Sequence, residues 1–133
     1  MWTVRRSCMH SRIKGNKSPT KAEQAVRELL ENSGYQVIAQ PCRLFPLPDG
    51  GTYTPDFLAW RTCDEGVVVA EVKGGYRGAG WEQGEERYRR AAAVYDCRQW
   101  RFCRIEVDVR KRSFDIQSWG DWGSDITSRE VEA

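Results

Sequence analysis

Two short apolar runs within residues 52–75, separated by a polar turn, constrain the fold of this chain more than any other stretch. Residues 53–60 and 67–72 are rich in aromatic and β-branched side chains, and the polar stretch between them ends in Gly66. This pattern predicts a β-hairpin with a loop of about four to six residues. The second run is too continuously apolar for an edge strand with one solvated face, so we expect it inside a sheet.

The predicted hairpin gathers acidic and basic side chains. Because side chains alternate along a strand, Glu71 and Lys73 share one face. If Trp60 pairs with Val67, Asp56 lies opposite Glu71. Opposed like charges destabilise a sheet, and close carboxylates raise each other's pKa unless a cation intervenes. Two interpretations follow: a functional site in which Lys73 and a divalent metal offset the charge, or an ordinary Glu-x-Lys ion pair on a solvated face beside an unrelated aspartate.

These residues also resemble a known motif. Pro55-Asp56 followed by Glu71-Val72-Lys73-Gly74 resembles the signature of the PD-(D/E)XK nuclease superfamily. The strings TYTPDF and VVVAEVKG are similar to those of its small phage members, which include the endonuclease I-like junction-resolving enzymes. The resemblance implies an α/β fold with an αβββαβ restriction-endonuclease-like core, in which helices flank a mixed central sheet. It also implies a metal-dependent endonuclease that hydrolyses DNA, with branched DNA such as Holliday junctions as a candidate substrate.

The same resemblance implies roles for individual residues. Asp56 and Glu71 would be the principal ligands of Mg²⁺, for which Mn²⁺ can substitute, and the backbone carbonyl of Val72 would add a third oxygen. Glu23 would hold a second metal or orient the attacking water. Lys73 would position that water or offset negative charge at the phosphoryl centre. Mg²⁺ is favoured over Zn²⁺ because the motif offers oxygen ligands and no His or Cys.

Glu23 belongs to the first predicted helix, for which Ser18 and Pro19 form a favourable start and Gly34 a favourable end. Apolar residues at helical spacing define the buried stripe of this helix: Ala22, Ala25, Val26, Leu29 and Leu30. Glu23 lies at the margin of the stripe, where a carboxylate can face the sheet. However, residues 20–23 also spell a capping box, which gives Glu23 an alternative, purely structural role. A helix start at Ser18 makes that alternative less natural.

The remaining elements complete the order helix, strand, strand, strand, helix, strand. Residues 35–45 are expected to form a first strand interrupted by Pro41. Residues 81–96 are expected to form a helix, and residues 100–109 a final strand with one solvated face. The nuclease domain then spans residues 18–112. In the C-terminal tail, residues 113–133, Trp119 and Trp122 are expected either to pack on the body or to stack on bases.

Charge is unevenly distributed, although the net charge is only +2. Residues 1–22 contain basic side chains and no acidic ones, so we expect residues 1–17 to form an arm that contacts DNA phosphates; a solvated tail is the alternative. Another candidate contact lies in the glycine-rich loop that follows Lys73. The candidate DNA-binding residues are Arg5, Arg6, Arg12, Lys14, Lys17 and Arg77.

Composition places the chain among single-domain globular proteins, with 133 residues, 40% of them hydrophobic and 30% charged. We expect no membrane association, because no apolar run approaches about 18 residues, and no secretory signal, because residues 1–20 lack an apolar core. The five cysteines are odd in number and form no CxxC pair, which indicates reduced thiols in a cytoplasmic setting. The resemblance to phage enzymes implies that this is a phage-infected or bacterial host cell. Cys8 and His10 are too few ligands for a metal site.

Assembly and activity leave alternatives open. In the junction-resolving relatives, a proline-containing bridge joins two subunits that exchange their first helix and strand. The proline-rich residues 46–51 permit such a swapped homodimer, but serve a monomer equally well. Besides an endonuclease, the sequence is compatible with a nuclease subunit that cuts only within a recombination or transposition assembly. A DNA-binding protein with a decayed site is a further alternative, against which the intact set Glu23, Asp56, Glu71 and Lys73 argues.

Overall fold

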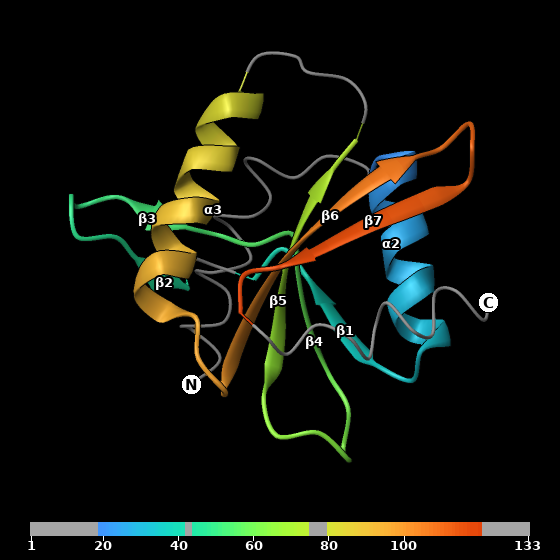
Figure 1. Cartoon of the computed structure of the whole chain (residues 1–133), viewed down its shortest axis with the longest axis horizontal. Coiled ribbons are helices and arrows are strands. Elements are labelled where there is room, and N and C mark those ends of the chain that lie inside the picture. The colour runs from blue at the N-terminus through green and yellow to red at the C-terminus, as the bar shows by residue number, and fades with distance from the viewer. Residues whose placement is uncertain (1–18, 42–43, 75–79, 121–133) are drawn as a thin grey trace, which may run out of the picture.

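The computed structural model describes residues 19–41, 44–74 and 80–120. In these segments a mixed five-stranded sheet lies between two helices, and a two-stranded hairpin lies beside one of them (Figure 1). This confirms the predicted α/β class with helices flanking a mixed central sheet. The helices are α2 (Lys21–Asn32) and α3 (Trp81–Tyr95). The strands are β1 (Gln36–Ala39), β2 (Phe45–Pro46), β3 (Thr52–Tyr53), β4 (Phe57–Trp60), β5 (Val67–Lys73), β6 (Trp100–Asp108) and β7 (Ser113–Ser118).

The predicted central hairpin is β4–β5, and its predicted register is confirmed. Phe57 lies opposite Ala70 and Ala59 opposite Val68 in an antiparallel pair. β5 pairs in parallel with β6 on its other side, in the sheet order β1-β4-β5-β6-β7. The apolar run of β5 is therefore explained by its internal position, where both of its faces are covered.

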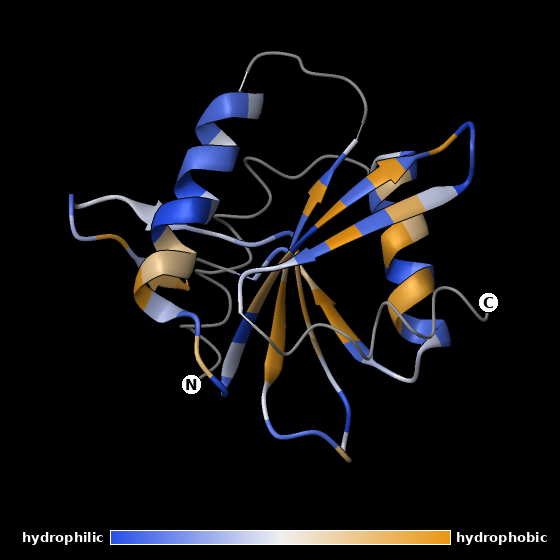
Figure 2. Cartoon of the chain, viewed as in Figure 1, coloured by the Kyte–Doolittle hydropathy of each residue, from blue (hydrophilic) through white to orange (hydrophobic). Residues whose placement is uncertain are grey.

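The two helices cover opposite faces of the sheet, and each face has its own apolar core. On the α2 face, Val26 and Leu30 belong to one cluster with Ala70 and Ile105. On the α3 face, Tyr88, Ala91 and Ala92 belong to a second cluster with Val69 and Phe102. Because Val69 and Ala70 are adjacent in β5, the alternation of side chains assigns them to different cores. In Figure 2, hydrophobic colour is concentrated on the central strands, in bands on α2 and toward the C-terminal end of α3.

The start of α2 differs from the prediction. Its N-cap is Thr20 rather than Ser18. The Thr20 hydroxyl oxygen accepts a hydrogen bond from the amide of Glu23 (3.1 Å), and the Glu23 carboxylate accepts one from the amide of Thr20 (2.9 Å). This capping box satisfies two otherwise unpaired amides at once. The predicted end is confirmed, because Gly34 adopts a left-handed φ of +92°.

The first strand is shorter than the predicted residues 35–45. β1 ends at Ala39, and Gln40 follows with a φ of +48°. Residues beyond Pro41 instead form β2, which pairs with β3 in a separate hairpin against α3. β3 and β4 are likewise separate strands, with Pro55 between them. Proline lacks an amide donor and disrupts a strand ladder, which explains both interruptions.

The C-terminal boundary also differs from the prediction. Residues 113–118, expected in the tail, form β7, which pairs antiparallel with β6. Phe114 and Ile116 pack against the α2-side core, while alternate residues are exposed. β6 is therefore an internal strand rather than the last one. On its predicted solvated face Arg104 is buried and Glu106 half-buried, and only Asp108 is exposed.

Two further predictions concern membrane association and the cysteines. In the described segments, no helix has the length and apolar character needed to cross a membrane. Cys63, Cys97 and Cys103 are free thiols.

The predicted DNA contacts of the basic arm and the glycine-rich loop lie outside the described residues: Arg5, Arg6, Arg12, Lys14, Lys17 and Arg77.

Candidate functional site

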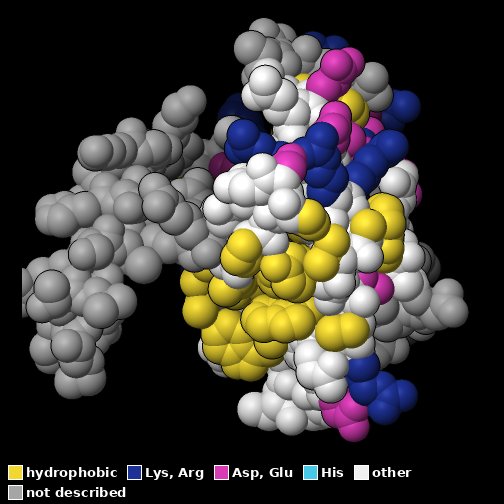
Figure 3. Space-filling model, turned by 90° about the vertical axis from the view of Figure 1, so that its left-hand side faces the viewer, with side chains coloured by type: hydrophobic (Ala, Val, Ile, Leu, Met, Phe, Trp, Pro, Cys, Tyr) yellow, Lys and Arg dark blue, Asp and Glu magenta, His cyan; other side chains and the backbone are white. Residues whose placement is uncertain are grey.

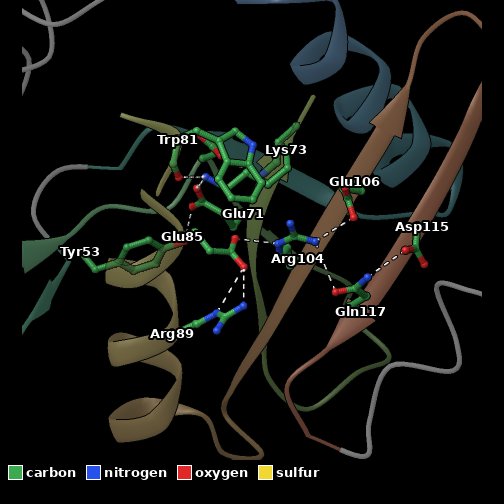
Figure 4. Close-up of polar contacts among 12 residues, drawn as sticks. Tyr53, Glu71, Lys73, Trp81, Glu85, Arg89, Arg104, Glu106, Asp115 and Gln117 are labelled. Carbon is green, nitrogen blue, oxygen red and sulfur yellow. Dashed lines mark hydrogen bonds and ion pairs between the residues drawn. The ribbon is translucent and has the colours of Figure 1, made fainter. Parts of the chain in front are cut away.

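The candidate site lies at the carboxyl end of β5, on the face that α3 covers. Glu71 and Lys73 are 7% and 6% exposed, and the Lys73 ammonium lies 3.3 Å from Oε2 of Glu71 (Figure 4). This is not an ion pair on a solvated face. Removing a carboxylate and an ammonium from water costs several kcal/mol, about as much as their attraction returns. The pair therefore stabilises the fold little and requires another explanation.

Asp56, which immediately precedes β4, reaches the same strand. Its amide donates to the carbonyl of Ala70 (3.1 Å), and its Oδ2 accepts from the amide of Val72 (2.7 Å). Because the N–H and C=O of one strand residue face the same neighbour, the carbonyl of Val72 faces Asp56 too. Burial, above all, raises the pKa of Asp56 to about 6, against the lowering effect of the Val72 amide.

Glu71 is the most perturbed carboxylate of the site. Burial, above all, and the charge of Asp56 raise its pKa to about 8, against the lowering effects of Tyr53 and Lys73. The Tyr53 hydroxyl donates to Oε1 at 2.6 Å (Figure 4). Each oxygen of Glu71 therefore contacts a donor, one from Tyr53 and one from Lys73. At neutral pH this carboxylate needs a proton or an additional cation beside it.

Glu23 lies nearby but is not part of this cluster. Its carboxylate caps α2, as the alternative interpretation of residues 20–23 proposed. Glu23 and Asp56 line the same small pocket between α2, β1 and β4, with a volume of about 130 Å³. The charge of Glu23 contributes to the raised pKa of Asp56. Among the described residues, no three His, Cys, Asp or Glu side chains are close enough to form a metal site by themselves.

The donors present nevertheless fit a Mg²⁺ ion. Mg²⁺ is commonly held by one or two carboxylates, with waters and substrate phosphates completing six oxygen ligands. Asp56 offers Oδ1, since its hydrogen bond with Val72 uses Oδ2. Glu71 and the carbonyl of Val72 would supply the other protein oxygens. A divalent ion there would also stabilise the ionised form of two carboxylates whose pKa burial raises.

A polar network, which the sequence did not reveal, fixes the position of Lys73. Its ammonium donates to the carbonyl of Trp81 (3.2 Å) and lies 5.1 Å from the centroid of the Trp81 ring. The Arg104 guanidinium lies 5.7 Å from the same centroid and donates to Glu85 at 2.7 Å (Figure 4). Arg104 was expected on a solvated face of β6, but it is buried because β7 and α3 enclose it.

Gly84 allows α3 to approach the site closely. A Cβ atom at this position would lie 3.1 Å from the Lys73 ammonium and 3.7 Å from Oε2 of Glu71. A glycine inside a helix costs about 1 kcal/mol relative to alanine, so its presence was the one sequence signal for this contact. Several residues around the site were not identified from the sequence: Tyr53, Trp81, Gly84, Glu85 and Arg104. Among them, only Gly84 left a signal in the sequence.

The surface around α3 is divided along the helix. On the face carrying α3 and the β2–β3 hairpin, an apolar patch lies below the main group of charged side chains, and a smaller charged group lies at the bottom (Figure 3). The sequence of α3 explains this, because its basic and acidic residues lie within residues 82–90 and apolar residues follow, among them the 53% exposed Val94. The candidate site adjoins the charged end, beside Trp81.

Tyr53→Phe is expected to weaken Mg²⁺ binding about tenfold or more, because the loss of a partner that orients a metal ligand typically costs that much. The ring stays in its aromatic cluster with Phe45, Tyr88 and Phe102, so the fold is retained. The measurement is Mg²⁺ titration by calorimetry. Tyr88→Phe is the matched control, since the hydrogen bond to Glu71 comes from Tyr53. Equal Mg²⁺ affinities of the two variants would contradict the role of Tyr53.

The metal-free protein is expected to lose stability as pH rises from about 5 to about 8. Over this window the folded state keeps protons on Glu71 and Asp56, whose pKa values are raised to about 8 and about 6. The unfolded chain has already released them, so the free energy of unfolding falls with pH. The lowered pKa values of Asp64 and Glu85 act in the opposite direction, but below this window.

Melting temperatures measured in EDTA across this range test the expectation. Glu71→Gln should flatten the decline, and Mg²⁺ should stabilise the wild-type protein more at the alkaline end, where protons no longer compete for the carboxylates. A profile that is flat in the wild-type protein, or identical in Glu71→Gln, would show that these carboxyl groups titrate normally.

Comparison with known proteins assigns no family to this site. No protein-family model matches the sequence, and a search of curated proteins found no significant match.

Proposed function

We propose that this chain is a metal-dependent DNA endonuclease with a PD-(D/E)XK site. One observation carries the proposal: the buried ion pair of Glu71 and Lys73 at the end of β5 lies next to Asp56, which accepts a hydrogen bond from the amide of the intervening Val72. Both carboxylates have a raised pKa, and strongly perturbed titratable groups concentrate at functional sites. The spacing Asp56…Glu71-Val72-Lys73 matches the nuclease motif residue by residue.

The chemistry of the cluster suits phosphodiester hydrolysis. Asp56, Glu71 and the carbonyl of Val72 would hold Mg²⁺, which supplies a more acidic bound water and charge relief at the phosphoryl group. Lys73 donates to the carbonyl of Trp81 and pairs with Glu71, so the third N–H of its ammonium is available to the attacking water or a phosphate oxygen. Because the cluster is buried, each of these electrostatic interactions is stronger than in water.

The arrangement of elements supports the same proposal. The order α2, β1, β4, β5, α3, β6 is compatible with the αβββαβ order expected of a restriction-endonuclease-like core, if the β2–β3 hairpin is an insertion and β7 an addition. The internal strand β5 carries Glu71 and Lys73, and Asp56 immediately precedes the neighbouring strand β4. Four further parts of the proposal rest on the sequence: branched DNA on the resemblance, contacts from the basic arm on its charge, and a cytoplasmic location on the cysteines. A swapped homodimer rests on the resemblance and the proline-rich bridge, which serves a monomer equally well.

A second candidate is a nuclease subunit that cuts only within a larger assembly. The engagement of Glu23 in the capping box favours it, because this carboxylate would have to leave the Thr20 amide to join a metal site. A partner or DNA that reorients Glu23 would then activate the centre.

Incubation of the purified protein with supercoiled plasmid and with a synthetic cruciform, in Mg²⁺, Mn²⁺ or EDTA, tests the proposal. An endonuclease converts the plasmid to nicked or linear forms in either metal and leaves it intact in EDTA. Preference for the cruciform would support selectivity for branched DNA. Binding without cleavage in both metals would overturn the endonuclease proposal and favour the subunit or a decayed DNA-binding protein.

A further inference from the structure

A groove distinct from the carboxylate cluster lies between α3 and the end of β7. Tyr88 and Arg89 of α3, Arg104 of β6, and Trp119, which follows β7, are among its lining residues. Its volume is about 230 Å³. Asp56, Glu71 and Lys73 do not line it, and neither the metal nor the hydrolytic chemistry proposed above uses it.

One wall of the groove is a fixed polar network. Glu85 accepts hydrogen bonds from Arg104 (2.7 Å) and from Arg89 (3.3 Å). Arg104 also donates to Gln117 (3.3 Å) and to Glu106 (3.0 Å), which links the wall to β7 (Figure 4). Because these side chains already hold one another in place, they lose little conformational entropy when a ligand binds at this wall.

The other wall carries an aromatic ring that is open to solvent. Trp119 is 47% exposed, although its backbone amide is fixed by a hydrogen bond to the carbonyl of Phe102 (2.9 Å). Its ring meets that of Tyr88 at 6.3 Å and 84°, an edge contact rather than a stack. Trp119 therefore packs on the body, as one of the two sequence-based alternatives proposed, and still presents ring surface to a ligand.

The two exposed groups define the ligand by their chemistry. An indole surface binds flat π systems by stacking, and the Arg89 guanidinium, whose side chain is 67% exposed, binds anionic oxygens. A nucleotide combines a flat base with an anionic phosphate. In a duplex each base is covered by its stacked neighbours, so only an unpaired base can lie on Trp119. Aromatic platforms beside cationic side chains are the usual means of holding single strands.

We propose that this groove binds an unpaired nucleotide of the nucleic-acid substrate, with the base on Trp119 and a phosphate at Arg89. The groove adjoins the candidate active site, because Arg104 in its wall and Lys73 in the site contact the same Trp81 ring. Cleavage of the bound strand rests on the proposed nuclease function. The groove would then specify the substrate class of that nuclease: DNA with a single-stranded segment next to the scissile phosphate.

The test measures binding of a fluorescein-labelled oligothymidylate to the full-length protein by fluorescence anisotropy, in EDTA so that no strand is cut. Trp119→Leu keeps apolar contact with Tyr88 but removes the π surface, whereas Trp119→Phe keeps a ring. Stacking on one aromatic side chain contributes about 1–3 kcal/mol per base. Trp119→Leu should therefore weaken binding about tenfold, and Trp119→Phe should retain most of the affinity.

Arg89→Gln supplies a second, independent measurement. Loss of one phosphate contact should reduce the slope of log K against log salt by about 0.7 on a single strand. Arg98→Gln is the matched control, because Arg98 is similarly exposed (74%) and also ion-paired, to Glu65 in the turn at the opposite end of β5. Its salt slope should equal that of the wild-type protein.

Equal affinities of the Leu and Phe variants, or an unchanged salt slope in Arg89→Gln, would overturn this inference. Failure of the nuclease proposal would look different. If the wild-type protein binds oligothymidylate through Trp119 but leaves plasmid uncut in Mg²⁺, the binding groove is supported and the nuclease proposal is contradicted. If Trp119→Leu binds the strand as well as the wild-type protein and cleaves plasmid normally, the nuclease proposal is supported and the binding groove is contradicted.

Discussion

Replacing Glu71 with glutamine is expected to reduce Mg²⁺-dependent plasmid cleavage about a thousandfold or more. Metal ions supply several kcal/mol of charge stabilisation to such transition states, and every 1.4 kcal/mol is about a factor of ten in rate. Glutamine preserves the volume and the acceptor for the Tyr53 hydroxyl, but removes the charge that would hold the metal. The loss should therefore appear in the cleavage step rather than in folding or DNA binding.

Single-turnover cleavage rates, DNA affinities and melting temperatures of the variant separate these contributions. DNA affinity should be equal or higher, since one negative charge no longer repels phosphate. Glu86→Gln is the matched control, because Glu86 is an exposed carboxylate of α3 that pairs with Arg90. If Glu71→Gln cleaves at nearly the rate of the control, Glu71 is not a metal ligand and the proposed site is wrong.

Lys73→Met is expected to reduce turnover by two to three orders of magnitude, about 3–4 kcal/mol of lost transition-state stabilisation. Methionine keeps the aliphatic volume beside Trp81 and removes only the ammonium. Mg²⁺ affinity should change little, because the proposed ligands are oxygens of Asp56, Glu71 and Val72. Calorimetric Mg²⁺ titration and single-turnover rates measured on the same preparation check both parts of this expectation.

The comparison variant for Lys73 is Lys111→Met, which removes an exposed ammonium from the β6–β7 turn. A purely structural role for Lys73 would give a different result. The variant would then melt at a lower temperature, and its activity at a permissive temperature would equal that of Lys111→Met. Such an outcome would leave the buried ion pair with Glu71 without a catalytic role.

The sequence was sufficient for the parts of the fold that depend on local pattern. The apolar runs of β4 and β5, and the spacing between them, predicted their register and hence the approach of Asp56 to β5. The sequence also predicted the apolar stripe of α2 and the end of this helix at Gly34. These features follow from side-chain periodicity and backbone conformation, which short stretches of sequence encode directly.

Other features depend on contacts between distant segments. Thr20 and Ser18 are both good helix caps, and the reciprocal bond with Glu23 decides between them in favour of Thr20. β7 alternates apolar and polar residues, but its partner, β6, had been expected to end the sheet. The burial of Arg104 requires α3 and β7 to close over it. Tyr53 and Gly84 reach Glu71 and Lys73 only through the packing of α3 and the β2–β3 hairpin on the sheet.

The location of a bound Mn²⁺ ion tests the central claim most directly. Crystals of the wild-type protein soaked in Mn²⁺ and measured at an anomalous wavelength should show a peak in contact with the carboxylates of Asp56 and Glu71 and the carbonyl of Val72. The same soak of Asp56→Asn crystals should abolish or greatly weaken it. A saturating soak that leaves this position without anomalous signal, or that places the ion only elsewhere, such as at Asp108 and Asp115 near the β6–β7 turn, would contradict the proposed metal-dependent centre.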